Sequence, residues 1–151
     1  MPERVKVSWT VDIHRSASEV FDYLADFSRH SEWSPSAFRT EGLGPGPVTA
    51  GTTFVSYGAV PGDKQHRNDV KVDEVQRPSR LAFTATEPNG DVFVNVFTIT
   101  GQDGSCRVER TWDLPKPNGL MGAVFPLLLR AYVRPHVQKG LDKLKSNVES
   151  A

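Results

Sequence analysis

The chain has 151 residues, which is about the size of one ordinary domain, so a single domain spanning residues 1–151 is predicted. Eighteen Lys and Arg residues balance 18 Asp and Glu residues, and neither sign gathers in a block. The charge pattern therefore favours neither nucleic acid nor anionic lipid as a partner. Cys106 is the only cysteine, which excludes an intrachain disulfide and a multi-cysteine zinc site and favours a reducing compartment.

The sequence carries no targeting or membrane-spanning pattern. Residues 1–11 already alternate between polar and apolar types and do not form the apolar core of a secretory signal. The longest apolar run, around Leu127–Leu129, is far too short to span a bilayer. We therefore expect a cytoplasmic protein without stable membrane insertion.

The first predicted elements are a strand and two short helices. Apolar residues alternate with polar ones over Val5–Ile13, which is the pattern of a strand with one buried face. Ser16 stands at the spacing of an N-cap for the amide three residues later, and apolar residues at helical spacing follow over 20–27. A second short helix is expected around His30–Trp33, ended by Pro35.

A loop rich in glycine and proline leads to five more predicted strands with short turns between them, which imply an antiparallel meander. These strands are Phe54–Ala59, His66–Val75, Leu81–Thr86, Val92–Thr100 and Cys106–Leu114.

The chain then ends in a predicted long amphipathic helix. Its apolar stripe repeats every three or four residues beside charged positions and consists of Val137, Leu141, Leu144 and Val148. Pro126 and Pro135 predict a break or kink near each of them in the first half of this helical segment.

This order of elements predicts an α+β helix-grip fold. A curved antiparallel sheet of six to seven strands would wrap around the long C-terminal helix, with two short helices after the first strand. The sheet must cover its apolar face, and the terminal helix is the only predicted element large enough to do so. Because strong twist curls the sheet away from the helix at one end, a cavity is expected between them, roofed by the early helices.

Several segments are also similar to a known family. They are residues 20–30 with Trp33 and Pro35 behind them, Gly51-Thr52-Thr53-Phe54, residues 77–83 and the terminal helix, in that order along nearly the whole chain. The chain thereby resembles the START-like (SRPBCC) superfamily of polyketide cyclases/dehydratases and lipid transport proteins. The resemblance implies the helix-grip fold and either carriage of an apolar molecule or cyclase/dehydratase-like catalysis, between which a shared fold does not choose.

Strand parity directs Arg110 inward. On the last predicted strand it shares a face with Val108 and Trp112. A guanidinium in the interior needs a carboxylate or a polar ligand, because an unpaired buried charge costs several kcal/mol. Three interpretations stay open: Arg110 anchors a carboxylate or carbonyl of an apolar ligand, it pairs with a carboxylate such as Glu74, or its side chain leaves through the mouth of the cavity.

The same parity directs His66 and Asn68 inward. A histidine beside a cavity can transfer protons near neutral pH, as an aldol cyclisation or dehydration requires, so His66 and Arg110 are the candidate catalytic residues. The alternative is that His66 is exposed near the turn at Pro61, where the strand frays. The direction of Asn95 is undecided, because both faces of its strand are apolar.

The chain holds more aromatic and bulky residues than one helix stripe needs, so some are expected to line a pocket, with core packing as the alternative for each. The residues predicted to contact a ligand are Trp33, Phe54, His66, Asn68, Phe83, Asn95, Arg110, Trp112, Met121, Phe125, Leu128 and Tyr132. Residues 119–126 hold two glycines and a proline among apolar residues. They are expected to gate the pocket, or to form an apolar surface for self-association, such as a homodimer, or for membrane contact.

No motif predicts a metal, a cofactor or a nucleophile. The four histidines lack the spacing of a zinc site, and Asp26 with His30 supplies only two scattered ligands. Phosphate loops, dinucleotide fingerprints and G-x-S-x-G elbows are absent from the sequence, and Cys106 has no adjacent histidine. The favoured function is binding of a polyketide, fatty acyl, lipid or isoprenoid-like molecule in the cavity, and the alternative is a polyketide cyclase/dehydratase-like enzyme.

Overall fold

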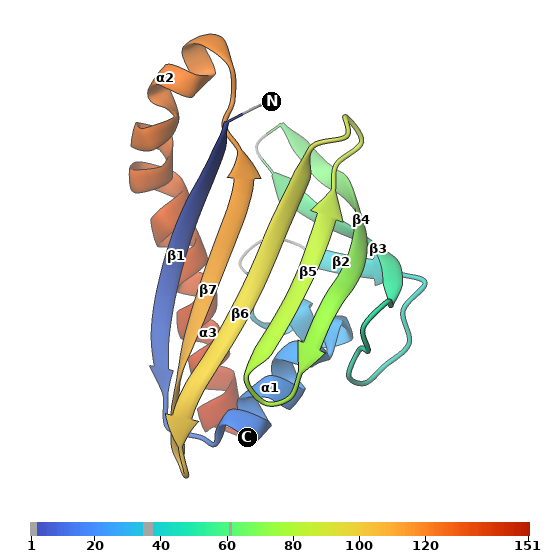
Figure 1. The fold of residues 1–151 in the computed structure, drawn as a ribbon, viewed down its shortest axis with the longest axis vertical. Coiled ribbons are helices and arrows are strands. Elements are labelled where there is room, and N and C mark those ends of the chain that lie inside the picture. The colour runs from blue at the N-terminus through green and yellow to red at the C-terminus, as the bar shows by residue number, and fades with distance from the viewer. Residues whose placement is uncertain (1–2, 35–37, 61) are drawn as a thin grey trace.

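The computed structural model describes residues 3–34, 38–60 and 62–151, so Pro35 and Pro61 lie outside the described residues. The elements follow the predicted order along the chain (Figure 1). The strands are β1 (Arg4–Ile13), β2 (Phe38–Glu41), β3 (Thr53–Val60), β4 (Asp63–Gln76), β5 (Arg80–Thr86), β6 (Val92–Gln102) and β7 (Ser105–Pro115). The helical elements are α1 (Ala17–Ala25), the 3₁₀ helix η1 (Phe27–Glu32), α2 (Gly119–Leu128), the π-helical turn η2 (Leu129–Val133) and α3 (Arg134–Glu149).

The strands form one antiparallel, curved sheet in the order β1-β7-β6-β5-β4-β3-β2. The first strand pairs with the last along its whole length, from Arg4 opposite Pro115 to Ile13 opposite Cys106. The strands from β3 to β7 are the predicted meander. The strand β2 was not predicted, because a strand of four residues is too short to show a clear period of two.

Two caps start the early helices. The Oγ of Ser16 accepts a hydrogen bond from the amide of Glu19 at 3.2 Å, as the sequence predicts for α1. Asp26 then accepts from the amide of Ser28 at 3.2 Å and starts η1. The second helix therefore begins at Phe27, earlier than predicted, and continues to Glu32.

The C-terminal helical segment distorts just before Pro135, as predicted, but not at Pro126. The helix α2 contains Pro126 without a break, and η2 leads from α2 into α3 without a loop. Pro135 has no N–H to donate, and its ring crowds the carbonyl one turn before it. A π turn relieves this conflict: the amide of Arg134 donates to the carbonyl of Leu129, five residues back.

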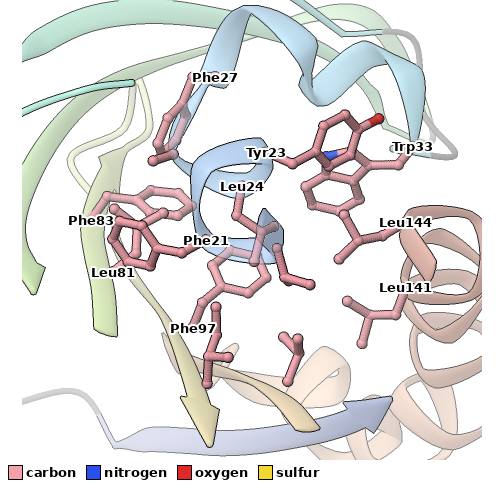
Figure 2. Packing of buried hydrophobic residues seen from close by; sticks show 14 of the residues in the cluster. Phe21, Tyr23, Leu24, Phe27, Trp33, Leu81, Phe83, Phe97, Leu141 and Leu144 are labelled. Carbon is pink, nitrogen blue, oxygen red and sulfur yellow. The ribbon is translucent and has the colours of Figure 1, made fainter. Parts of the chain in front are cut away.

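The helix α3 buries its apolar stripe against β1 and α1. All four residues of the predicted stripe are buried, and Leu141 and Leu144 are fully enclosed. Figure 2 shows them facing side chains that come from α1 and from the sheet. On the β1 side, the Trp9 indole donates to the carbonyl of Arg134 at 3.2 Å. Because α3 covers only the β1 side of the sheet, the apolar inner face of the strands toward β3 must be covered by another element.

Candidate functional site

A cavity of about 340 Å³ lies between η1 and the inner faces of β3 to β7. It is lined by Phe27, His30, Trp33, Ser34, Phe54, Ser56, Val60, Asn68, Val70, Phe83, Ala85, Phe93, Asn95, Arg110, Trp112 and Leu114. None of these residues comes from α3. The cavity is therefore roofed by η1, as the sequence predicted for the early helices, but it is not enclosed by the C-terminal helix as predicted, because α3 packs on β1 and α1.

The 3₁₀ geometry of η1 places three rings over the sheet. With three residues per turn, Phe27, His30 and Trp33 project from one side of this segment. Phe27 stacks on His30 with ring centroids 4.2 Å apart, and it contacts Phe54 and Phe83 edge to face at 5.1 and 4.9 Å. Figure 2 shows Phe27 and Phe83 facing each other from η1 and β5. These rings form an apolar roof and wall.

Arg110 is the only Lys, Arg, Asp or Glu among the described residues that line the cavity. It lies on the inner face of β7, together with Trp112. Its guanidinium carbon lies 5.5, 5.1 and 5.2 Å from the ring centroids of Trp33, Phe97 and Trp112. Its Nε is buried and has no hydrogen-bond partner in the described part of the chain. The aromatic faces attract the cation, and no carboxylate there neutralises it.

Glu74 does not pair with Arg110. A β-bulge between Val72 and Glu74 inserts one residue into β4 and reverses the parity of the strand beyond it. Glu74 therefore lies on the outer side, where its carboxylate accepts from Arg80 at 2.8 Å. Of the alternatives that the sequence left open for Arg110, this pairing is excluded by the structure.

Burial lowers the pKa of Arg110 to about 10, so the side chain still carries its charge at neutral pH. A buried cation costs several kcal/mol, whereas each aromatic face returns about 0.5 to 2 kcal/mol. The cavity wall thus holds a charge that its own residues only partly stabilise. An anion or a carbonyl oxygen placed beside Arg110 would supply the stabilisation of this charge that the cavity wall lacks.

All four buried polar side-chain atoms that lack a hydrogen-bond partner among the described residues belong to residues of the cavity wall. They are Trp33 Nε1, Asn68 Oδ1, Arg110 Nε and Trp112 Nε1. Each such atom costs about 1 to 3 kcal/mol, so they are few in folded proteins and are not expected to cluster. Three of the four are donors. The cluster therefore suits a molecule that carries acceptor oxygens at one end.

His30 lies on the cavity wall and is neutral. Its Nε2 lies 2.8 Å from the carbonyl oxygen of Leu24, to which it donates a hydrogen bond. Burial, together with the charge of Arg110, lowers the His30 pKa from 6.5 to about 4.

This lowered pKa predicts a loss of stability in acid. The unfolded chain takes up a proton on His30 near pH 6.5 but the folded chain only near pH 4, so the free energy of unfolding falls as the pH drops between these values. We expect His30 to account for about 2 kcal/mol between pH 6.5 and 4.5. Urea unfolding of the wild type and of His30→Gln at both pH values measures it, and equal pH dependence in the two proteins would contradict it.

His66 does not line the cavity. The strand β5 ends with Thr86 opposite Asp69, so His66 lies beyond that end, next to Glu87. Its Nε2 is 2.8 Å from Glu87 Oε1 and its Nδ1 is 3.3 Å from Asp63 Oδ2. Burial lowers the His66 pKa, but the two carboxylates outweigh it and the net shift is upward. The imidazole is thus engaged at the rim by protein carboxylates.

Met121, Phe125, Leu128 and Tyr132 do not line the cavity either. The helix α2 extends past the edge of the sheet (Figure 1), and η2 packs Leu129 and Val133 against the core while Tyr132 stays exposed. Phe125 is buried and borders a separate hollow with Phe93, whereas the other three are 40–53% exposed.

The cavity brings together seven of the predicted ligand contacts. They are Trp33, Phe54, Asn68, Phe83, Asn95, Arg110 and Trp112. The direction of Asn95, which the sequence left undecided, is inward, because it lies opposite Phe83 and Trp112 in the neighbouring strands. The contributions of Phe27 and His30 were not predicted, although the three-residue spacing before Trp33 would have indicated them.

Within the described ranges, no three His, Cys, Asp or Glu side chains gather closely enough to hold a metal ion. No helix in the same ranges is long and apolar enough to cross a membrane.

A curved antiparallel sheet that closes on a C-terminal helix and keeps an apolar cavity defines a helix-grip domain. The chain belongs to the family described as polyketide cyclase / dehydrase and lipid transport, whose profile matches residues 4–149. The comparison with curated protein sequences found no match.

Solved structures share the fold over nearly the whole chain. The ZhuI aromatase/cyclase from Streptomyces sp. R1128 is similar with a TM-score of 0.72 and 17% identity, over 97% of this chain and 94% of that chain. The protein TTHA0849 from Thermus thermophilus is similar with a TM-score of 0.72 and 16% identity, over 97% and 98%. DynU16, a protein of the dynemicin biosynthetic locus, has a TM-score of 0.64 and 19% identity, over 95% and 47%. At these identities the likeness shows the fold.

Proposed function

We propose that the protein binds an apolar small molecule of the polyketide, fatty acyl, lipid or isoprenoid type in the cavity under η1. The observation that carries this proposal is the gathering of all four unpartnered buried polar atoms of the described residues on one otherwise apolar wall. Burial of the ligand would supply most of the affinity. Covering some 300 Å² of apolar ligand surface contributes about 7 kcal/mol before the costs of association.

The polar atoms would orient the ligand. The Nε–H of Arg110 and the indole N–H groups of Trp33 and Trp112 donate, so they suit a carboxylate, an enolate or a carbonyl oxygen. Asn68 Oδ1 accepts, so it suits a hydroxyl group. The ligand class is therefore an apolar body with an oxygen-bearing end, held with that end against β7 and β4.

Two measurements test this proposal. Native mass spectrometry of protein purified from a lipid-rich host should show a co-purified apolar ligand. Calorimetric titration with 2-naphthoate and with its neutral methyl ester should show that both bind and that the carboxylate binds about tenfold more tightly, because a hydrogen bond to a charged group adds about 1.5 kcal/mol or more. Failure to find or to load any apolar ligand would count against the proposal.

A variant that fills the cavity gives a sharper test. Ala85 lies on the inner face of β5, so the ring of Ala85→Phe would occupy the space of the ligand. We expect naphthoate binding to weaken by roughly tenfold or more, while the free energy of unfolding changes by about 1 kcal/mol or less. Thr84→Phe places the same ring on the outer face and is the control. Unchanged calorimetric affinity in Ala85→Phe would show that the ligand binds elsewhere.

The position of Arg110 also favours a second candidate function, a cyclase/dehydratase-like enzyme that uses the same cavity. A guanidinium in an apolar wall would stabilise negative charge that develops on a carbonyl oxygen, and the wall would hold a reactive chain in a folded shape. Assays of a poly-β-ketone thioester with the wild type, Arg110→Ala and His66→Ala test it. Equal turnover in all three proteins would eliminate the catalytic roles predicted for Arg110 and His66.

A further inference from the structure

The helix α2 carries an apolar face that the rest of the described chain does not cover. Leu120 is 82% exposed and Leu127 is 68% exposed, and Met121 and Val124 are exposed beside them. Their spacing along the helix places these side chains on one side. Figure 1 shows α2 extending past the edge of the sheet.

The opposite side of α2 is attached to the body of the domain. Phe125 is buried there, and a side chain at position 122 in place of Gly122 would collide with the carbonyl of Pro117. Contacts on one side therefore hold the helix, and its exposed leucines do not result from fraying. An apolar face held outward in this way is typical of an interaction site.

Basic residues outnumber acidic ones in the stretch of chain that holds this face. The chain has no acidic residue between Asp113 and Asp142. The basic residues in that interval are Lys116, Arg130, Arg134 and Lys139. Lys116 pairs with Glu3 at 3.5 Å, whereas Arg130 and Lys139 form no ion pair among the described residues. Lys139 borders the same shallow groove as the exposed Tyr132 and as Asp142. The chain as a whole is neutral, so this local excess is not visible in its net charge.

We propose that this face docks the protein on the surface of an anionic phospholipid bilayer. Leucine and methionine side chains enter the boundary between headgroups and acyl chains, and lysine and arginine beside them are attracted by anionic headgroups. The helix would lie in the plane of the interface. Self-association through this face is the alternative occupant, and the measurements below distinguish it from docking on a bilayer.

Docking would bring the cavity near the bilayer. Phe93 lines both the cavity and the hollow under Phe125, so α2 lies beside the wall of the proposed ligand site. Exchange of an apolar ligand with the membrane rests on the proposed function. The docking itself does not, because it uses only the outer face of α2.

Co-sedimentation of the full chain with vesicles tests the proposal. We expect binding to vesicles of phosphatidylcholine and phosphatidylserine at about 7:3, at least about fivefold weaker binding to phosphatidylcholine alone, and weakening with salt. Leu120→Gln combined with Leu127→Gln should reduce binding by roughly tenfold or more, because both side chains would lose their insertion. Arg130→Gln combined with Lys139→Gln should abolish the preference for phosphatidylserine.

Matched controls keep the result interpretable. Lys6→Gln combined with Arg107→Gln removes two positive charges from the exposed face of β1 and β7 and should bind vesicles like the wild type. The thermal midpoint of the Leu120/Leu127 variant should match that of the wild type, since both side chains are exposed. Its calorimetric affinity for 2-naphthoate should also be unchanged, so loss of docking is separable from loss of ligand binding.

Three outcomes would overturn the proposal. The first is no binding to the phosphatidylserine vesicles, and the second is equal binding by the wild type and the Leu120/Leu127 variant. The third is a dimer of the wild type and a monomer of this variant by light scattering, with no vesicle binding by either protein. The last result would assign the face to self-association.

Discussion

Arg110→Met is expected to raise the free energy of unfolding of the ligand-free protein by about 1 to 3 kcal/mol and to weaken 2-naphthoate binding by roughly 30-fold or more. The stability gain follows from the burial of a cation without a carboxylate. Methionine fills a similar volume, keeps contact with the rings of Trp33, Phe97 and Trp112, and has no charge to desolvate. Urea unfolding at pH 7 measures the first effect and calorimetry the second.

The opposite signs of these two effects distinguish a ligand anchor from a structural residue. If Arg110 had a structural role, its substitution would lower the free energy of unfolding of the protein. Arg107→Met is the matched control on the same strand, because Arg107 faces outward, is 63% exposed and pairs with Asp12 at 2.7 Å. It should change stability by only about 0.5 kcal/mol and leave binding intact. A destabilised Arg110→Met protein with normal naphthoate affinity would remove Arg110 from the proposed site.

Leu141→Ala is expected to lower the free energy of unfolding by about 3 to 4 kcal/mol. Leu141 is fully buried on the stripe of α3 that packs against β1 and α1, so the shorter side chain leaves a cavity where these elements meet. Urea unfolding measures the loss. No other element of the described chain covers the β1 side of the sheet, and the substitution therefore weakens the contact that holds the fold closed.

Leu127→Ala is the control for this prediction in the same helical segment. Leu127 is 68% exposed, so its truncation should change the free energy of unfolding by only about 0.5 kcal/mol. A similar loss in both variants would show that α2 is packed in solution and would contradict the exposed face described above. A loss below about 1 kcal/mol in Leu141→Ala would contradict the anchoring role of α3.

Local patterns were sufficient to predict most of the fold. The alternation over Val5–Ile13, the cap at Ser16 and the stripe that includes Leu141 each depend on neighbours a few residues away, and each is confirmed. The inward direction of Arg110 follows from strand parity in the same way, because no bulge interrupts the pairing of β7. The three aromatic rings around the Arg110 guanidinium could not be predicted from the alternation of side chains along the strand.

By itself, then, the sequence determined the order of elements, the helix-grip class and the presence of a lone arginine on an inner strand face, since periodicity and capping act over a few residues. The roof of early helices was expected too, but only the tertiary structure decided that α3 takes no part in lining the cavity, because α3 docks on β1 and leaves the strands from β3 to β6 to η1. It also decided that a bulge turns Glu74 outward and that His66 meets Glu87 beyond the end of β5. These outcomes depend on contacts between residues far apart in the chain, which no local pattern records.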